Sequence, residues 1–252
     1  MMNKPLLEAC VGSLKSCIYA VRAGADRLEL CAHLVIGGCT PSPVLFRQVK
    51  KACPDVKINV IIRPRFGDFL YTEEEMDLMC EEIKIFRELG ADGVVIGCLT
   101  PEGNLDVEKM KRLMDCAGEM DVTLHRAFDM TRDPMDTLEK AIELGCKTIL
   151  TSGQQKDVTA GRDCLKEIYE TAAGRIDIMA GSGVKSWNIQ EIHDSTGISV
   201  FHATGKIGVT ESGMKYRKET VSMGLPSLSE YELWESDEQE LRACAETVHS
   251  WG

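Results

Sequence analysis

Three stretches of the sequence share one local pattern, in which a glycine able to end a helix is followed a few residues later by a short apolar run. The runs are Leu28–Leu30, Val94–Ile96 and Thr148–Leu150, and the glycines before them are Gly24, Gly90 and Gly145. A glycine just past the last helical turn takes the left-handed conformation that ends a helix, and β-branched residues favour the strand that follows. Such a junction, repeated along a chain, is typical of alternating helices and parallel strands.

The same reasoning predicts eight strands. They are expected at about 6–11, 27–31, 57–63, 93–97, 121–125, 147–151, 176–180 and 198–202. Between them, apolar residues recur every three to four positions, which indicates helices with one buried face. One such set is Met76, Met79, Ile83 and Phe86. Capping boxes are predicted at the starts of the third and last helices, from Thr72 with Glu75 and from Ser236 with Gln239.

These elements predict a (β/α)8 TIM barrel, an α/β fold in which eight parallel strands are surrounded by helices. Several strands are continuous apolar runs, as is usual for strands covered on their outer face by helices. A length of 252 residues suits one such barrel, so we expect a single domain over 1–252. An open, doubly wound sheet is the alternative. The irregular stretch 204–235 is too long for a minimal connection, and we expect it to cover the barrel mouth or to make a subunit contact.

Charge and cysteine content restrict the partners and the compartment. The net charge of −11 argues against nucleic acid and anionic membranes, because both need a basic face on the protein. The eleven cysteines include no CxxC pair and favour reduced thiols over a disulfide framework. The sequence has no segment typical of a signal peptide or a membrane span. We therefore expect a cytoplasmic protein.

Polar residues are dense at the predicted strand ends, where the active face of such barrels is built. The set comprises Glu8, Cys10, Glu29, Cys31, Arg63, Arg65, His125, Arg126, Asp129, Thr151, Ser152, Gln154 and His202. If the barrel closes, these side chains gather at one end. The residues that bind a ligand or perform chemistry are therefore expected within this set.

Several long strings resemble the CutC copper homeostasis family, over nearly the whole chain and in the family's order. They are Arg27–Cys31, Gly37–Ser42, Ile61–Arg65, Gly67–Phe69, His125–Asp129 and Leu150–Gly153. The resemblance implies a cytoplasmic TIM barrel linked to copper, present as a homo-oligomer such as a dimer or tetramer. It also implies a copper-binding role for Cys10 and Cys31. Cys39 and Ala203 stand where similar sequences carry Thr and Cys, which puts in doubt a third thiol ligand from strand eight.

The residues themselves give partial support to copper. Leu7-Glu8-Ala9-Cys10 and Leu28-Glu29-Leu30-Cys31 are two versions of one pattern at corresponding depths on consecutive strands. Neighbouring strands lie about 4.8 Å apart, so the two thiols can share one ion. Soft sulfur ligands favour Cu(I), which makes Cu(I) the expected cofactor. The alternative is that both cysteines are small core residues.

A second group of residues predicts an anion site. Arg63, Arg65 and Arg126 place positive charge at one mouth of an acidic protein, and guanidinium groups suit carboxylate or phosphate. Gly181 and Gly183 follow strand seven, where barrels often bind phosphate through backbone N–H groups. A small anionic metabolite is the expected ligand. The alternative is that the arginines form an internal ion-pair network with nearby carboxylates.

Acid–base chemistry is the remaining hypothesis for the mouth. His125 is a candidate general acid or base, with Asp129 or Glu29 orienting it, or else a buried polar residue of a barrel layer. The sequence thus leaves two functions open. One is a cytoplasmic protein that binds Cu(I) through paired cysteines. The other is a TIM-barrel enzyme that acts by acid–base chemistry on a small carboxylate or phosphate metabolite.

Overall fold

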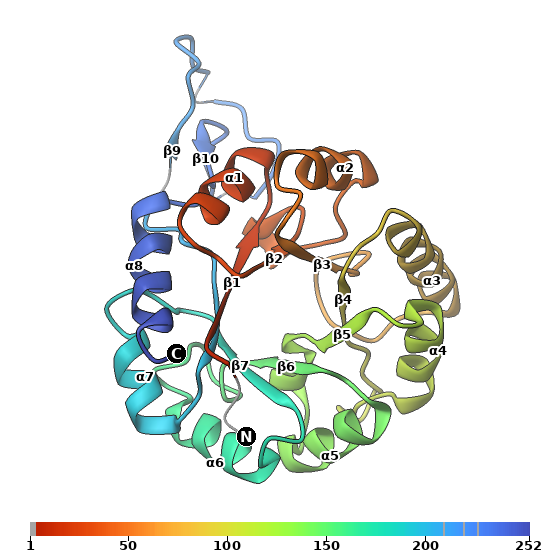
Figure 1. Ribbon diagram of the computed structural model, residues 1–252. Helices are drawn as coiled ribbons and strands as arrows, with labels where there is room; N and C mark the ends of the chain where they lie inside the picture. Colours follow the sequence, from red (N-terminus) through yellow and green to blue (C-terminus); the bar gives the residue numbers. More distant parts are fainter. Residues whose placement is uncertain (1–3, 209, 219, 226) are drawn as a thin grey trace.

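The chain closes into a barrel of eight parallel strands in the computed structural model, which describes residues 4–208, 210–218, 220–225 and 227–252 (Figure 1). The strands are β1 (Leu6–Val11), β2 (Arg27–Leu30), β3 (Lys57–Ile61), β4 (Gly93–Ile96), β5 (Asp121–Leu124), β6 (Thr148–Thr151), β7 (Asp177–Gly181) and β8 (Val200–Ala203). Each predicted strand is present, with bounds shifted by at most two residues. The TIM barrel is confirmed, and the open sheet is excluded because β8 pairs with β1.

Helices surround the barrel, as the alternating pattern predicts (Figure 1). Within the described residues they are α1 (Leu14–Arg22), α2 (Pro43–Ala52), α3 (Glu73–Glu88), α4 (Val107–Ala117), α5 (Pro134–Leu144), α6 (Arg162–Ala172), α7 (Ile189–Thr196) and α8 (Glu238–His249), with short 3-10 helices η1 (Leu34–Ile36) and η2 (Arg126–Met130). No helix of the described residues is both long and apolar enough to span a bilayer.

The main core lies between the outer face of the barrel and the helices. The predicted helical stripe of Met76, Met79, Ile83 and Phe86 is buried there. Phe86 meets Phe46 of α2 edge to face, with ring centroids 5.6 Å apart. Burial of large apolar side chains is the dominant stabilising term in such a fold, and edge-to-face aromatic contacts add to it.

The helix ends agree with the sequence pattern except at one position. Gly145, with φ 84°, ends α5 in the left-handed conformation, and the capping box of Thr72 and Glu75 is confirmed at the start of α3. The predicted box of Ser236 and Gln239 is wrong. The N-cap of α8 is Asp237, whose carboxylate accepts a hydrogen bond from the backbone N–H of Glu240. A carboxylate is a strong N-cap group.

The Ser236 side chain is used elsewhere, since its hydroxyl donates to the backbone carbonyl of Thr204. The stretch 204–235 is irregular, as expected, but holds a short antiparallel pair, β9 (Thr210–Glu211) with β10 (Glu232–Leu233). This arm extends outward beyond α8 and α1 (Figure 1). Of its described residues, only Thr204 lines the main cavity, so it does not cover the barrel mouth.

The strand register positions the polar residues. Cys10 of β1 stands beside Glu29 of β2, and Glu8 of β1 stands beside His202 of β8. Residues two apart on a strand share a face, so Glu8 and Cys10 point to the same side of β1. Leu7 and Ala9 belong instead to the core shared with the helices. The interior of the barrel thereby receives carboxylates, thiols and an imidazole from three adjacent strands.

Candidate metal and ligand site at the barrel mouth

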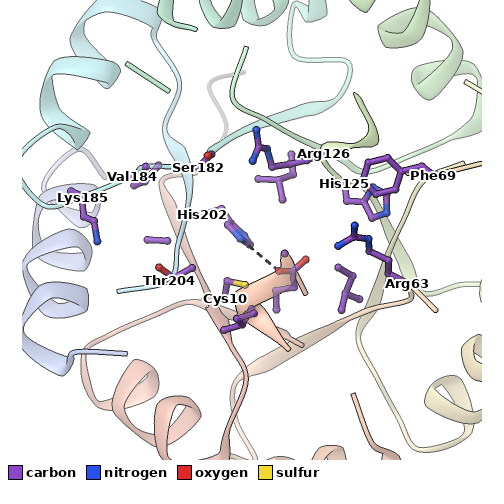
Figure 2. Close-up of a pocket in the computed structure, with 17 residues that line it drawn as sticks. Cys10, Arg63, Phe69, His125, Arg126, Ser182, Val184, Lys185, His202 and Thr204 are labelled. Atoms are coloured by element: carbon purple, nitrogen blue, oxygen red, sulfur yellow. Dashed lines mark ion pairs between the residues drawn. The ribbon is translucent and has the colours of Figure 1, made fainter. Parts of the chain in front are cut away.

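A cavity of about 300 Å³ opens at the carboxyl end of the barrel (Figure 2). Its polar lining residues are Cys10, Glu29, Arg63, His125, Arg126, Ser182, Lys185, His202 and Thr204. Figure 2 shows Lys185 and Thr204 on one side, Arg63 and His125 on the other, and His202 and Cys10 between them. The volume lies at the lower end of the range for small-molecule pockets. Of the strand-end residues expected to gather here, Cys10, Glu29, Arg63, His125, Arg126 and His202 line the cavity, whereas Glu8, Cys31, Arg65, Asp129, Thr151, Ser152 and Gln154 do not.

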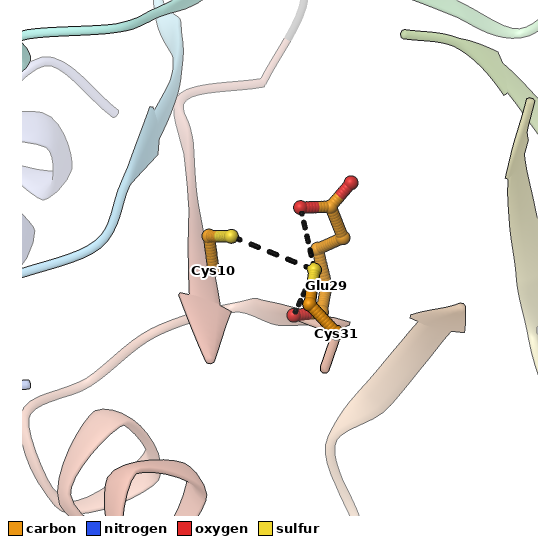
Figure 3. Close-up of side chains that lie close together, drawn as sticks. All are labelled: Cys10, Glu29 and Cys31. Atoms are coloured by element: carbon orange, nitrogen blue, oxygen red, sulfur yellow. Dashed lines mark hydrogen bonds between the residues drawn. The ribbon is translucent and has the colours of Figure 1, made fainter. Parts of the chain in front are cut away.

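Cys10, Glu29 and Cys31 form a cluster of two thiols and one carboxylate (Figure 3), and Cys10 and Glu29 line the cavity. The sulfur atoms of Cys10 and Cys31 are 3.7 Å apart, and Glu29 Oε2 accepts a hydrogen bond from Cys31 Sγ at 3.3 Å. One donor atom from each of the three residues lies within 4.8 Å of the others. Cys10 lines the cavity, whereas Cys31 lies behind it and is 1% exposed. Neighbouring strands thus bring both thiols together, and Cys10 faces the cavity.

Proton sharing differs between the two thiols. The hydrogen bond from Cys31 lowers the pKa of Cys10 well below its usual range against the effect of burial, and His202 lowers that pKa further. Burial raises the pKa of Cys31, and the neighbouring Cys10 raises it further. Burial also raises the pKa of Glu29, with Cys10 contributing. Cys10 is therefore the sulfur that carries thiolate character, and thiolate is the form that binds metals.

A buried charge network holds His202 beside this cluster. Glu8 Oε1 accepts a hydrogen bond from His202 Nδ1 at 2.8 Å, and Glu8 Oε2 pairs with Arg27 Nε at 2.5 Å. Burial alone would raise the pKa of Glu8, but Arg27 and His202 lower it to about 2. Burial opposes the charged form of His202, yet Glu29, Cys10 and Glu8 raise its pKa. Because Nδ1 is held by Glu8, Nε2 is left facing Glu29 Oε2 at 3.6 Å.

His125 is a neutral imidazole. Its Nδ1 accepts a hydrogen bond from the backbone N–H of Ala127, so the proton sits on Nε2. Burial lowers the pKa of His125 to about 3, and the charge of Arg63 contributes. The Nε2 atom has no hydrogen-bond partner among the described residues. Phe69 lies against the ring with centroids 4.7 Å apart. The expected orienting contact from Asp129 or Glu29 is absent from the described residues, because backbone geometry orients the ring instead.

Arg63 has no ion-pair partner among the described residues. Its Nη atoms donate to the backbone carbonyls of Ile36, Gly38 and Gly67, at 2.9 to 3.3 Å, and its Nε is buried without a partner. The guanidinium also lies over the Phe69 ring, 5.1 Å from its centroid. A buried guanidinium held only by carbonyl groups keeps its full positive charge beside the cavity.

Arg126 and Arg65 behave differently from Arg63. Arg126 lines the cavity and pairs with Asp129, whose Oδ2 lies 2.7 Å from Nε. Arg65 pairs with Glu75 at 2.5 Å and with Asp68 at 3.1 Å, and it does not line the cavity. The alternative expectation, that the arginines form ion pairs with nearby carboxylates, therefore holds for Arg65 and in part for Arg126. It does not hold for Arg63.

Asp129 organises the loop after β6. Its carboxylate accepts hydrogen bonds from Thr151 Oγ1 at 2.5 Å and from the backbone N–H groups of Ser152 and Gln154 at 3.1 Å. Together with the ion pair to Arg126, these hydrogen bonds give both carboxylate oxygens of Asp129 a partner. Asp129 thus positions Arg126 and the loop.

The comparisons with known proteins place the chain in one family. The family model of the CutC family matches residues 5–207. The chain belongs to the CutC family. A CutC family protein of Bacteroides fragilis is 47% identical over 232 residues, which cover 92% of each chain. The copper homeostasis protein cutC homolog of Homo sapiens is 42% identical over 241 residues, which cover 95% of this chain and 88% of the human one.

Solved structures agree with this assignment. The CutC protein of Streptococcus agalactiae has a TM-score of 0.76 at 31% identity, with 79% of this chain and 98% of that chain covered. An aldolase named QR15 has a TM-score of 0.60 at 16% identity, which shows a shared fold alone.

In this member of the CutC family, the two glycines predicted to bind phosphate have different positions. Gly183 lines the cavity with φ 73°. Gly181 ends β7 and does not line the cavity, and a Cβ there would lie 2.4 Å from Leu150 Cδ1. Gly181 is therefore required by packing against β6.

Sequence reasoning missed several cavity residues of this CutC chain. Phe69, Lys185 and Thr204 were not recognised as cavity residues, and outside the cavity Arg27 was not recognised as the partner of Glu8. A signal for Lys185 was available, because it follows Gly181-Ser182-Gly183 in the loop after strand seven. Phe69 lies in a string that resembles the CutC family, but its place in the cavity depends on the path of the loop before α3.

Proposed function

We propose that this protein binds Cu(I) through Cys10 and Cys31 and thereby takes part in copper homeostasis in the cytoplasm. The observation that carries the proposal is the 3.7 Å separation of the two sulfur atoms beside an open cavity. Two thiolates suit Cu(I), a soft ion that accepts low coordination numbers. The names of the human and bacterial relatives point to the same metal. The self-association expected from the family belongs to this proposal as well.

The neighbours of the sulfur pair offer a third ligand. With metal–sulfur bonds of about 2.3 Å, two sulfurs 3.7 Å apart lie close enough to share one ion. Glu29 and His202 are the neighbouring candidates. Imidazole suits copper, whereas carboxylate suits harder ions, so His202 is the favoured third ligand.

A competition titration tests the proposal. Cu(I) is titrated into reduced protein in the presence of a chromophoric Cu(I) chelator, with wild type compared with the Cys10→Ser, Cys31→Ser double variant. The matched control is Cys116→Ser with Cys164→Ser, because these two cysteines are the partly exposed ones. We expect the first double variant to lose the tight site and the control to keep it. If the control loses binding instead, Cu(I) binds nonspecifically to surface thiols, and the proposal fails.

A second function is favoured by one observation, the unpaired charge of Arg63 beside the neutral His125. We infer that the cavity also binds a small carboxylate or phosphate metabolite, with Arg63, Arg126 and the loop at Gly183 as its binding groups. Charge-assisted hydrogen bonds to Arg in a desolvated site are each worth about 1.5 to 3 kcal/mol. The His125 Nε2–H is suited to donate a hydrogen bond to a developing negative charge, as neutral imidazoles do in barrel enzymes.

A thermal-shift screen tests this second function. Anionic metabolites are added with metal chelated, and hits must raise the melting temperature because ligand stabilises the folded state. Arg63→Lys removes the guanidinium and keeps the charge, and Arg65→Lys is the matched control outside the cavity. We expect each hit to lose its shift in Arg63→Lys only. Equal shifts in both variants, or no hit at all, would leave the arginines with a structural role alone.

A further inference from the structure

Three cations from three loops surround the cavity. Arg63 follows β3, Arg126 follows β5, and Lys185 follows β7. Of these, only Arg126 has a carboxylate partner among the described residues. Lys185 donates to the backbone carbonyl of Lys206, which leaves its charge uncompensated. Locally focused positive charge in a chain of net charge −11 attracts a small anion to this mouth.

The same cavity reaches the proposed copper ligands. Cys10 lines it together with the three cations, so one bound molecule can contact both. The lining also includes apolar side chains, among them Leu34, Ile61 and Leu150. A bare metal ion needs neither the space nor the cations. The cavity therefore fits a molecule that has anionic groups, a short apolar stem and an affinity for sulfur-bound metal.

The preference of Cu(I) for sulfur ligands indicates that the molecule in this cavity is a thiol. Cu(I) is held by soft sulfur ligands, and the main soluble thiols of a reducing compartment are carboxylate-bearing molecules of the glutathione kind. We propose that Cu(I) enters as its complex with such a small anionic thiol, whose carboxylates bind Arg126, Arg63 and Lys185 while its metal passes to Cys10 and then Cys31. The inference rests on the proposed Cu(I) function and adds the chemical class of the donor.

The transfer is a ligand exchange without electron transfer. Two copper–sulfur bonds to the carrier break, and two form to Cys10 and Cys31. Cys10 enters as the thiolate, the proton released from Cys31 goes to one departing carrier thiolate, the second carrier leaves as a thiolate, and copper remains Cu(I). Cys10 acts first because it lines the cavity, whereas Cys31 is more buried and does not line it.

The test compares an anionic with a neutral carrier. Transfer rates to reduced protein are measured by stopped flow from Cu(I) in excess glutathione and from Cu(I) in excess 2-mercaptoethanol. The test variant is Arg126→Gln with Lys185→Gln. The control, Lys140→Gln with Lys166→Gln, removes the same charge from positions on α5 and α6 that lie outside the cavity. Thermal melts confirm that each variant is folded.

We expect the test variant to slow transfer from glutathione about ten-fold or more, and to change transfer from 2-mercaptoethanol less than about two-fold. The control should change neither rate by more than about two-fold. Equal slowing for both carriers, or equal slowing in test and control variants, would overturn the inference. Failure of the Cu(I) proposal has a different signature, since tight binding would then survive in the Cys10→Ser, Cys31→Ser protein.

A metal-free measurement gives an independent readout. Reduced glutathione is titrated into the Cys10→Ser, Cys31→Ser protein and followed by NMR. We expect saturable shifts at the Lys185 and Arg126 backbone amides, which disappear when both cations are replaced by Gln. Shifts that persist after this replacement would contradict carrier binding by these residues.

Discussion

Glu8 and His202 are joined across the seam where the last barrel strand meets the first, by a 2.8 Å hydrogen bond from Nδ1 to the Glu8 carboxylate. A carboxylate that holds one ring nitrogen of a histidine fixes the tautomer and directs the other nitrogen outward. Here the other nitrogen faces Glu29, beside the thiol pair. Metal-binding histidines are commonly held in this way, so the relationship suits His202 to the role of third ligand in the proposed copper site.

The first prediction concerns His202 as third copper ligand. His202→Ala should lower Cu(I) affinity about ten-fold or more, whereas His193→Ala should not, because the His193 ring stacks on Trp251 away from the cavity. Competition titration gives the affinities. X-ray absorption on the copper-loaded wild type should show two sulfurs and one nitrogen, and the variant should lose the nitrogen. A wild-type spectrum with sulfur ligands alone would exclude His202.

The second prediction concerns the stability of the buried pair. Glu8→Gln leaves the Arg27 guanidinium buried without its counter-charge, so the free energy of unfolding should fall by about 3 to 5 kcal/mol. The matched control is Glu238→Gln, which breaks a partly exposed pair with Arg242 and should cost less than about 1 kcal/mol. Urea unfolding measures both. If Glu8→Gln and Glu238→Gln lower the free energy of unfolding by similar small amounts, Arg27 has other partners in the Glu8→Gln protein.

The third prediction is a pH dependence from His125. Its pKa is about 3 in the folded chain against 6.5 ordinarily, so between these values the unfolded chain binds a proton that the native chain does not. The stability that the neutral ring contributes is therefore fully present above pH 6.5 and is lost as pH falls. At pH 5 the loss should be about 2 kcal/mol.

The control for this pH effect is His125→Asn, which keeps an acceptor for the Ala127 N–H and removes the titration. The difference in unfolding free energy between wild type and variant should shrink by about 2 kcal/mol from pH 7 to pH 5. Urea unfolding at several pH values measures it. Parallel pH profiles would show that His125 is charged or solvated in the native state.

The fourth prediction concerns Gly97, which lies against the His125 ring. A Cβ at position 97 would lie 2.6 Å from His125 Cε1 and 2.9 Å from Ala127 Cβ. Gly97→Ala should therefore displace the ring, cost about 1 to 3 kcal/mol and shift the imidazole NMR signals. Gly208→Ala is the control, because a Cβ there meets nothing within 4 Å. Unchanged imidazole signals in Gly97→Ala would mean that the backbone moves instead.

The barrel could be predicted because its signals are local. Glycine after a helix and β-branched runs act within a few residues, and they located all eight strands. The ends of the strands were harder to predict, because strand pairing stops where a backbone group forms a hydrogen bond to a side chain instead of to the neighbouring strand. β3 stops at Ile61, since the Arg63 N–H bonds to the Thr40 hydroxyl and not to a neighbouring strand.

The candidate site was only partly predictable for a related reason. The thiol pair follows from a pattern repeated on two adjacent strands, and the strand register brings the sulfurs together. The position of Arg65 depends on Glu75, which belongs to the cap of the next helix. The positions of Lys185 and Thr204 depend on how two loops approach each other, which no single segment of sequence specifies.

The seam between Glu8 and His202 also sets an order of assembly. The two residues are 194 positions apart, and a ribosome adding about 5 to 20 residues per second needs about 10 to 40 s to make the intervening chain. For most of that time Cys10 and Cys31 are already synthesised, but His202, the proposed third ligand, does not yet exist. A nascent chain therefore carries the proposed copper site in incomplete form, and that site is complete only after the eighth strand docks.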